Sequence, residues 1–99
     1  MRLLTEAEYK ATMEPEPVQI GPDDDPPFDF WAYFDQIPES DLAGHDFSEG
    51  TVTYAWHMPR GNLQHVLVNC ERPNVFLVLV LDLNHAEVLG HYLLDIFGV

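Results

Sequence analysis

The stretch Val75-Phe76-Leu77-Val78-Leu79-Val80-Leu81 is the longest uninterrupted apolar run in the chain. Its length and its content of β-branched residues are typical of a strand rather than a helix. Side chains on a strand alternate between two faces, and here both alternating sets are apolar. Such a strand must be covered on both faces. The run therefore predicts the buried central strand of a sheet, which the rest of the chain has to cover.

The residues around this run repeat with a period of two, which indicates further strands. Short polar turns separate them, the first at Pro59-Arg60-Gly61-Asn62. These connections are too short for the crossover that parallel strands need, so the pairing should be antiparallel. Together they predict a four-stranded β-meander in sequential order, with strands at 51–58, 63–70, 75–83 and 87–97.

The N-terminal half contains signals for short helices. Thr5 and Glu8 have the spacing of a capping box, which predicts a helix from Glu6 to about Met13. Aromatic residues recur at helical spacing between residues 30 and 37, after Asp29 as a possible N-cap. A further short turn is expected near Ser40-Asp41-Leu42. Between the first two helices, residues 14–27 form a proline-rich acidic arm that we expect to be extended.

These elements predict an α+β fold in one domain, residues 1–99, with an acidic helical and proline-rich half (1–50) and a β-meander half (51–99). The N-terminal helices can cover one face of the sheet. The other face needs either the proline-rich arm or a second copy of the chain, so a homodimer through the sheet is the alternative cover.

The charge of the chain is strongly one-sided. Four Lys and Arg residues stand against seventeen Asp and Glu residues, which gives a net charge of −13. Residues 1–50 hold thirteen of the acidic residues against Arg2 and Lys10 alone. This charge disfavours direct binding to nucleic acid and to anionic membranes, because both bind through Lys and Arg. It favours a basic protein partner, although solubility alone is the simpler interpretation.

The sequence favours a cytoplasmic protein. Cys70 is the single cysteine, so an intrachain disulfide is excluded. The first residues become acidic without an apolar segment, so we expect no secretory signal. The chain has no apolar run long enough to span a membrane.

No motif in the chain fixes a chemistry. Nucleotide-binding, zinc-protease and catalytic-serine patterns are missing, so we expect no catalytic residue, no metal and no cofactor. The hairpin pairings 56 with 65, 65 with 80 and 80 with 89 would place Trp56, His65, Asp82 and His91 on one face, as a possible ligand pocket. The two histidines would then lie on the order of 10 Å apart, too far to share a zinc ion. Half-buried structural histidines are the simpler interpretation.

Two functional hypotheses follow. The first is a non-enzymatic acidic binding module, either an immunity-like or antitoxin-like inhibitor or a regulator of a basic protein. Its binding residues would be the acidic and aromatic ones around the arm and the second helix: Asp23, Asp24, Asp25, Asp29, Trp31 and Asp35. The second hypothesis is a small ligand-binding domain or enzyme that uses the histidine and aspartate cluster on the sheet.

Overall fold

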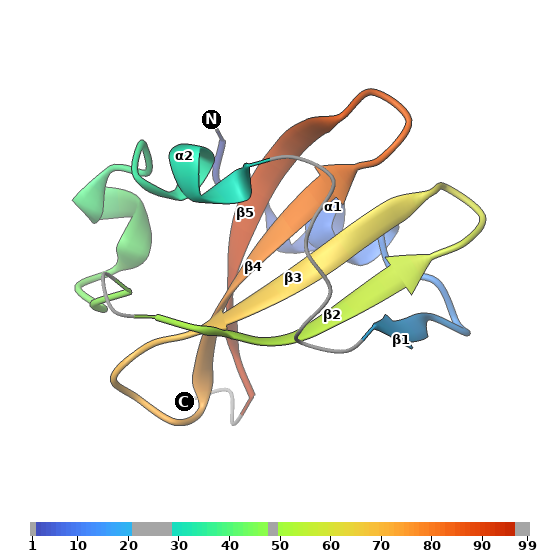
Figure 1. Cartoon of the computed structure of the whole chain (residues 1–99). Helices are drawn as coiled ribbons and strands as arrows, with labels where there is room; N and C mark the ends of the chain where they lie inside the picture. Colours follow the sequence, from blue (N-terminus) through green and yellow to red (C-terminus); the bar gives the residue numbers. More distant parts are fainter. Residues whose placement is uncertain (1, 21–28, 48–49, 97–99) are drawn as a thin grey trace.

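A computed structural model describes residues 2–20, 29–47 and 50–96 of the chain. Three short helical segments precede the main strands (Figure 1). The elements in chain order are α1 (Glu6–Ala11), β1 (Val18–Ile20), α2 (Phe30–Phe34), the 3-10 helix η1 (Glu39–Leu42), β2 (Val52–Met58), β3 (Leu63–Asn69), β4 (Val75–Asp82) and β5 (Glu87–Asp95).

The strands form one antiparallel sheet in the order β1-β2-β3-β4-β5, so the predicted α+β class is confirmed. The sheet has five strands instead of the predicted four. The additional strand, β1, comes from the proline-rich arm and pairs Val18 with His57 and Ile20 with Ala55. Four residues without proline lie between Pro17 and Pro22. At the edge of a sheet a short segment needs to pair with only one neighbouring strand, so the flanking prolines do not prevent it from pairing. The rest of the predicted arm, residues 21–28, lies outside the described residues.

Both helices begin at the residues that the capping signals indicate. The Thr5 hydroxyl accepts a hydrogen bond from the Glu8 amide at 3.2 Å, and the Glu8 carboxylate accepts one from the Thr5 amide at 3.1 Å. Asp29 Oδ1 accepts from the amides of Trp31 and Ala32. The helices end earlier than predicted, because hydrogen bonds of turn type take over after Ala11 and after Phe34.

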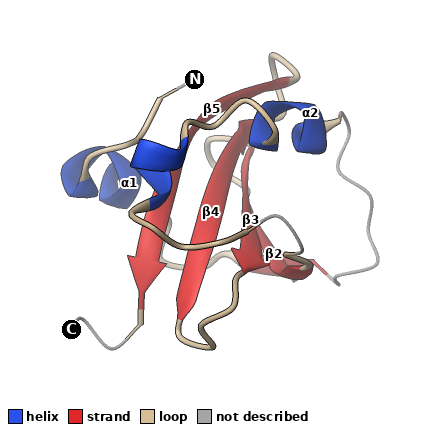
Figure 2. Ribbon diagram, turned by 90° about the vertical axis from the view of Figure 1, so that its left-hand side faces the viewer, coloured by secondary structure: helices blue, strands red, loops and turns tan. Residues whose placement is uncertain are grey.

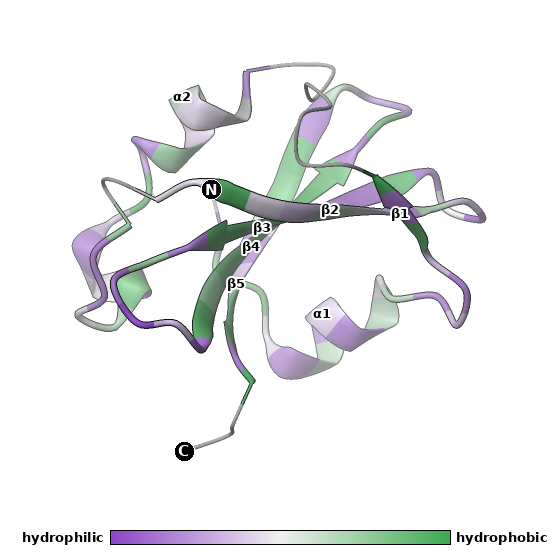
Figure 3. Ribbon diagram, turned by 60° about the horizontal axis from the view of Figure 1, so that its bottom comes forward, coloured by the Kyte–Doolittle hydropathy of each residue, from purple (hydrophilic) through white to green (hydrophobic). Residues whose placement is uncertain are grey.

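The central strand β4 is buried on both faces, as predicted. Leu77, Leu79 and Leu81 face α2 and η1, whereas Val78 and Val80 face Leu4 and Tyr9 on the α1 side. Figure 2 shows α1 and α2 on opposite sides of the sheet, and Figure 3 shows hydrophobic residues along the central strands between them. Each face of the sheet is therefore covered by a helix of the same chain. The homodimer that we predicted as an alternative is not needed to bury the second face.

A β-bulge in β5 changes the predicted register. Val80 pairs with Gly90 rather than with Leu89, while Leu81 still pairs with Val88. Leu89 is thus the extra residue, and beyond it every side chain of β5 faces the opposite way. His91 accordingly pairs with Leu79 and lies on the α2 side, not on the His65 side as predicted.

The N-terminal segment lies along the outer side of β5 at this bulge. Leu3 forms an isolated parallel bridge with His91, which the sequence did not predict. The Leu4 amide donates to the His91 carbonyl at 2.7 Å, and the His91 amide donates to the Arg2 carbonyl at 3.0 Å. A Cβ atom on Gly90 would lie 2.7 Å from the Arg2 carbonyl oxygen. Glycine is needed here because the two backbones approach so closely.

Candidate functional site

An open hollow lies beside α2, η1 and the loop that follows them. Its volume is about 550 Å³. The apolar lining residues are buried or half-buried and form its floor, whereas the acidic ones are exposed and form its rim. The floor residues are Phe34, Ile37, Leu42 and Phe47, the rim carboxylates are Asp35, Glu39 and Asp46, and Gly44 and His45 are the other lining residues. We call this feature the acidic hollow.

Local structure explains how these residues come to surround one space. Pro38 separates α2 from η1, and η1 ends in two left-handed residues, Ala43 with a φ of 53° and Gly44 with a φ of 80°. These two residues form a tight turn that reverses the direction of the chain. Glycine adopts the left-handed conformation at little cost, because it has no Cβ atom. Phe47 then returns to the sheet, where it is only 1% exposed and packs in the core with Leu77 and Leu79.

Two carboxylates of the acidic hollow, those of Asp35 and Glu39, differ from the paired carboxylates of α1. Glu6 is paired with Lys10 at 2.8 Å, and the hydrogen bond from that lysine, followed by its charge, lowers the pKa of Glu6. Glu8 is paired with Arg2. Within residues 2–20, 29–47 and 50–96, neither Asp35 nor Glu39 has an ion-pair partner. The sequence explains the contrast, since it has no Lys or Arg between positions 10 and 60.

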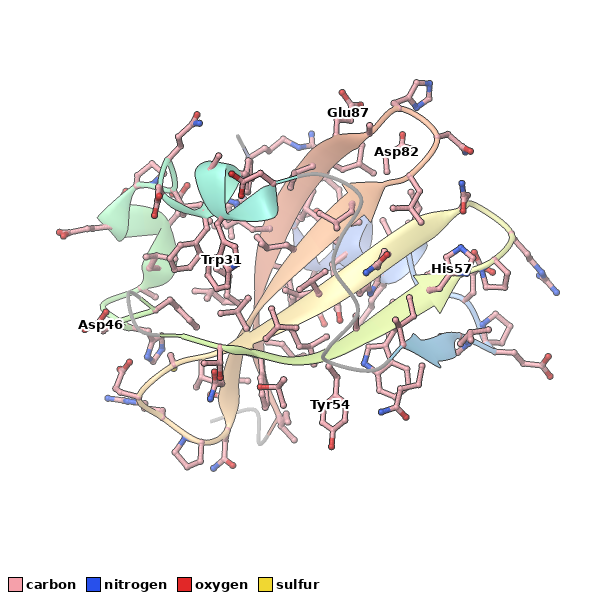
Figure 4. The ribbon with its side chains drawn as sticks, viewed as in Figure 1. Trp31, Asp46, Tyr54, His57, Asp82 and Glu87 are labelled. Atoms are coloured by element: carbon pink, nitrogen blue, oxygen red, sulfur yellow. The ribbon has the colours of Figure 1, made fainter. Side chains whose placement is uncertain are left out.

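The structure brings only part of the predicted partner-binding set to this hollow. Asp35 lines it. Asp29 instead caps α2. Trp31, which Figure 4 labels below α2, is 38% exposed, and its ring meets the Phe34 ring edge-on with the centroids 5.3 Å apart. Asp23, Asp24 and Asp25 lie outside the described residues. Glu39 and Asp46 were not among the predicted residues, although both line the hollow with Asp35. Glu39 begins η1, directly after Pro38, and Asp46 follows the left-handed pair Ala43 and Gly44.

Two of the four predicted pocket residues do meet. Trp56 and His65 line an apolar cavity of about 230 Å³ under α1, together with Tyr9, Met13, Pro17, Met58, Leu67 and Leu94. His65 is 2% exposed, and its Nε2 lies 2.9 Å from the Thr12 hydroxyl. Burial lowers the pKa of His65 from 6.5 to about 4, so the ring is neutral near pH 7. A neutral histidine bonded to a hydroxyl fits the simpler interpretation, a structural core residue.

The other two predicted pocket residues lie elsewhere. His91 is fully buried on the α2 face, where its Nδ1 lies 2.8 Å from the Tyr33 hydroxyl and its Nε2 lies 3.6 Å from Asp41 Oδ2. Burial lowers the pKa of His91, and the negative charge of Asp41 opposes that shift. Asp82 lies in the β4–β5 hairpin and bonds the His85 ring at 2.6 Å. The predicted cluster of histidine and aspartate is therefore divided among three places.

Two further groups of side chains have the composition of metal ligands. The first is His45, Cys70 and Glu71, and the second is Asp82, His85 and Glu87. Within each group the candidate ligand atoms lie within 4.8 Å of one another. Figure 4 labels Asp82 and Glu87 of the second group, and far from them Asp46, whose amide donates to Glu71 of the first group.

No protein-family model, no curated protein and no solved structure matches this chain. Among the described residues, no helix combines the length and the apolar character that crossing a membrane requires.

Proposed function

We propose that the chain is a non-enzymatic binding module whose acidic hollow receives a basic side chain of a partner protein. The observation that carries this proposal is the combination of an apolar floor with a carboxylate rim in one hollow. Arginine and lysine have an apolar stem and a charged head, so they match both parts of it. Arginine fits best, because its planar fork can bond two carboxylates at once.

The composition of the hollow favours a role in binding over a role in solubility alone. A surface that only keeps the protein dissolved needs charge, and an apolar floor beneath the charge adds nothing to that role. Asp35 and Glu39 have no ion-pair partner among the described residues, so they can exchange water for a partner cation without first breaking such a pair. Such complementarity increases the association rate and rejects acidic competitors.

The specific form that we propose is a cytoplasmic immunity-like or antitoxin-like inhibitor of a nucleic-acid enzyme, or a regulator of another basic protein. Enzymes that act on nucleic acids bind phosphates through Lys and Arg. An acidic protein with a net charge of −13 competes for those same groups. The alternative, a ligand pocket or enzyme built from His65, Asp82 and His91, is less favoured because these residues lie at separate places.

The first experiment probes the acidic hollow with N-acetyl-arginine amide by two-dimensional ¹H–¹⁵N NMR. We expect saturable amide shifts at Leu42 and Phe47, and their loss in the double variant Asp35→Asn/Glu39→Gln. The matched control is Glu16→Gln/Glu87→Gln, which removes the same charge from exposed sites away from the hollow. Shifts of similar size in both double variants would show diffuse attraction to an acidic surface and contradict the proposal.

The second experiment measures a partner captured from the native host. Two exposed or half-exposed charge pairs contribute on the order of 1.4 kcal/mol together, so the Asp35→Asn/Glu39→Gln variant should bind about tenfold more weakly. The loss should shrink at high salt, because salt screens exposed charges over about 8 Å at physiological ionic strength. If affinity is the same for this variant, the control variant and the original chain, the acidic half serves solubility alone.

A further inference from the structure

Three different metal-binding side chains converge where the loop before β2 meets the β3–β4 turn. His45 comes from that loop, and Cys70 and Glu71 come directly after β3. Their imidazole nitrogen, thiol sulfur and carboxylate oxygen all lie within 4.8 Å of one another. Residues 45 and 70 are far apart in the sequence, so the tertiary fold alone brings them together.

The carboxylate of Glu71 is already oriented for a ligand role. Its Oε2 accepts a hydrogen bond from the Asp46 amide at 2.8 Å, and its Oε1 faces His45 Nδ1 at 3.7 Å. In a tetrahedral zinc site with bonds of about 2.0–2.3 Å, neighbouring ligand atoms lie roughly 3.3–3.6 Å apart. The distance between His45 and Glu71 is therefore close to the edge of such a tetrahedron. The Asp46 amide acts as the outer hydrogen bond that typically fixes a ligating carboxylate.

The Cys70 sulfur lies no more than 4.8 Å from the other two ligand atoms, so a shift of at most about 1 Å would complete the same arrangement. Its sulfur accepts a hydrogen bond from the Arg72 amide at 3.4 Å and makes long contacts to the carbonyls of Val75 at 3.5 Å and Arg72 at 3.6 Å. On metal binding the thiol proton passes to solvent and a thiolate forms. The amide of Arg72 can keep its bond to that thiolate, while the two contacts to carbonyls are given up.

Space for a fourth ligand lies beside these side chains. A hollow of about 220 Å³ borders the thiol and the carboxylate, and the other described residues that line it are Asp46, Gly50 and Asn69. A water molecule or a side chain of a bound protein has room there. Three protein ligands with one open position is a coordination pattern that zinc adopts in proteins.

We propose that His45, Cys70 and Glu71 form a zinc site with one open position. The donor set selects the metal, since a thiolate and an imidazole prefer zinc to calcium or magnesium, which take oxygen ligands. A bound ion would join the loop at residue 45 to the turn at residue 70 and so fix one wall of the acidic hollow. The proposal does not depend on that hollow binding a partner.

Cobalt(II) is the probe that tests this site, because it replaces zinc and absorbs light when a thiolate binds it. The full chain, reduced and freed of metal, is titrated with Co²⁺ and then with Zn²⁺. We expect one equivalent of Co²⁺ to produce a near-ultraviolet thiolate-to-cobalt band, and Zn²⁺ to abolish it. Cys70→Ser should lose the band, and His45→Gln and Glu71→Gln should each weaken binding at least tenfold.

The control variant is His85→Gln, which disrupts the second group of candidate ligands in the β4–β5 hairpin. It should leave the cobalt band and the affinity unchanged. Circular dichroism verifies the fold of each variant, and if Cys70→Ser does not fold, His45→Gln and Glu71→Gln carry the test. The proposal is overturned if the original chain gives no thiolate band, or if the band survives unchanged in both of those variants.

Discussion

The buried histidine of the α1 face should make the stability of this protein fall on mild acidification. His65 is 2% exposed, and its Nε2 lies 2.9 Å from the Thr12 hydroxyl. Burial lowers its pKa from 6.5 to about 4. The unfolded chain therefore takes up a proton at a higher pH than the folded chain. Stability from this residue is fully present above pH 6.5 and is lost as the pH falls from 6.5 towards 4.

The size of the effect follows from the difference between the two pKa values. Each pKa unit corresponds to about 1.4 kcal/mol, and pH 4.5 lies about two units below the unfolded value. Acidification from pH 7 to pH 4.5 should therefore cost about 2–3 kcal/mol through His65 alone. That is a large part of the stability of a small domain, which is typically about 5–15 kcal/mol.

The assay compares the original chain with His65→Gln, whose side chain does not titrate. Urea unfolding gives the free energy of unfolding of both proteins at pH 7 and at pH 4.5. The difference between the two proteins should fall by about 2–3 kcal/mol between these pH values. The other titrating groups contribute equally to both proteins, so their contributions cancel in the difference between the two free energies of unfolding. One of these groups is His91, which lies on the opposite face of the sheet.

His85→Gln is a control for which the pH dependence of stability should have the opposite sign. The hydrogen bond and charge of Asp82 raise the pKa of the exposed His85, so its contribution to stability grows on acidification, for as long as Asp82 remains ionised. NMR titration of the His65 ring gives a direct check. A measured pKa of His65 near 6.5, or a free-energy difference that does not change with pH, would refute this account of the buried ring.

The remaining predictions concern local packing and capping. Gly90→Ala should destabilise the fold by about 1–3 kcal/mol in urea unfolding, because the added carbon would lie 2.7 Å from the Arg2 carbonyl oxygen. Gly61→Ala, whose added carbon would meet nothing closer than 3.5 Å, should change stability by less than about 0.5 kcal/mol, and equal losses at both glycines would contradict the close approach at β5. Thr5→Ala should cost about 1 kcal/mol by removing the hydroxyl that accepts from the Glu8 amide, and an unchanged thermal midpoint would show that the capping box contributes little.

Several features of the fold were predictable because they depend on neighbouring residues. The apolar run 75–81 indicated a strand buried on both faces, and the short turns indicated an antiparallel order for the strands after residue 50. The capping box at Thr5 indicated where α1 begins. The pairings of residue 65 with residues 56 and 80 were also correct, because the first two hairpins contain no bulge at those positions.

The predictions from the sequence were wrong where contacts between distant segments determine the structure. The bulge at Leu89 lies next to Gly90, and the N-terminal segment packs against Gly90. No local pattern in the sequence of β5 indicates this contact with the N-terminal segment. The bulge alone moved His91 from the predicted pocket to the opposite face. Likewise, β1 forms only because the edge of β2 is present to pair with it.

The acidic character of the chain is set by composition, whereas the arrangement of its sites is set by the tertiary structure. Net charge is a sum over residues and does not depend on how the chain folds. A hollow or a metal site requires particular atoms within a few ångströms of one another. Here the chain reversal at Ala43 and Gly44 brings Asp46 to the hollow that Asp35 also lines, and it places His45 near the turn after β3. Distances of that kind depend on backbone geometry accumulated over many residues, so periodicity and capping signals, which act over a few residues, cannot determine them.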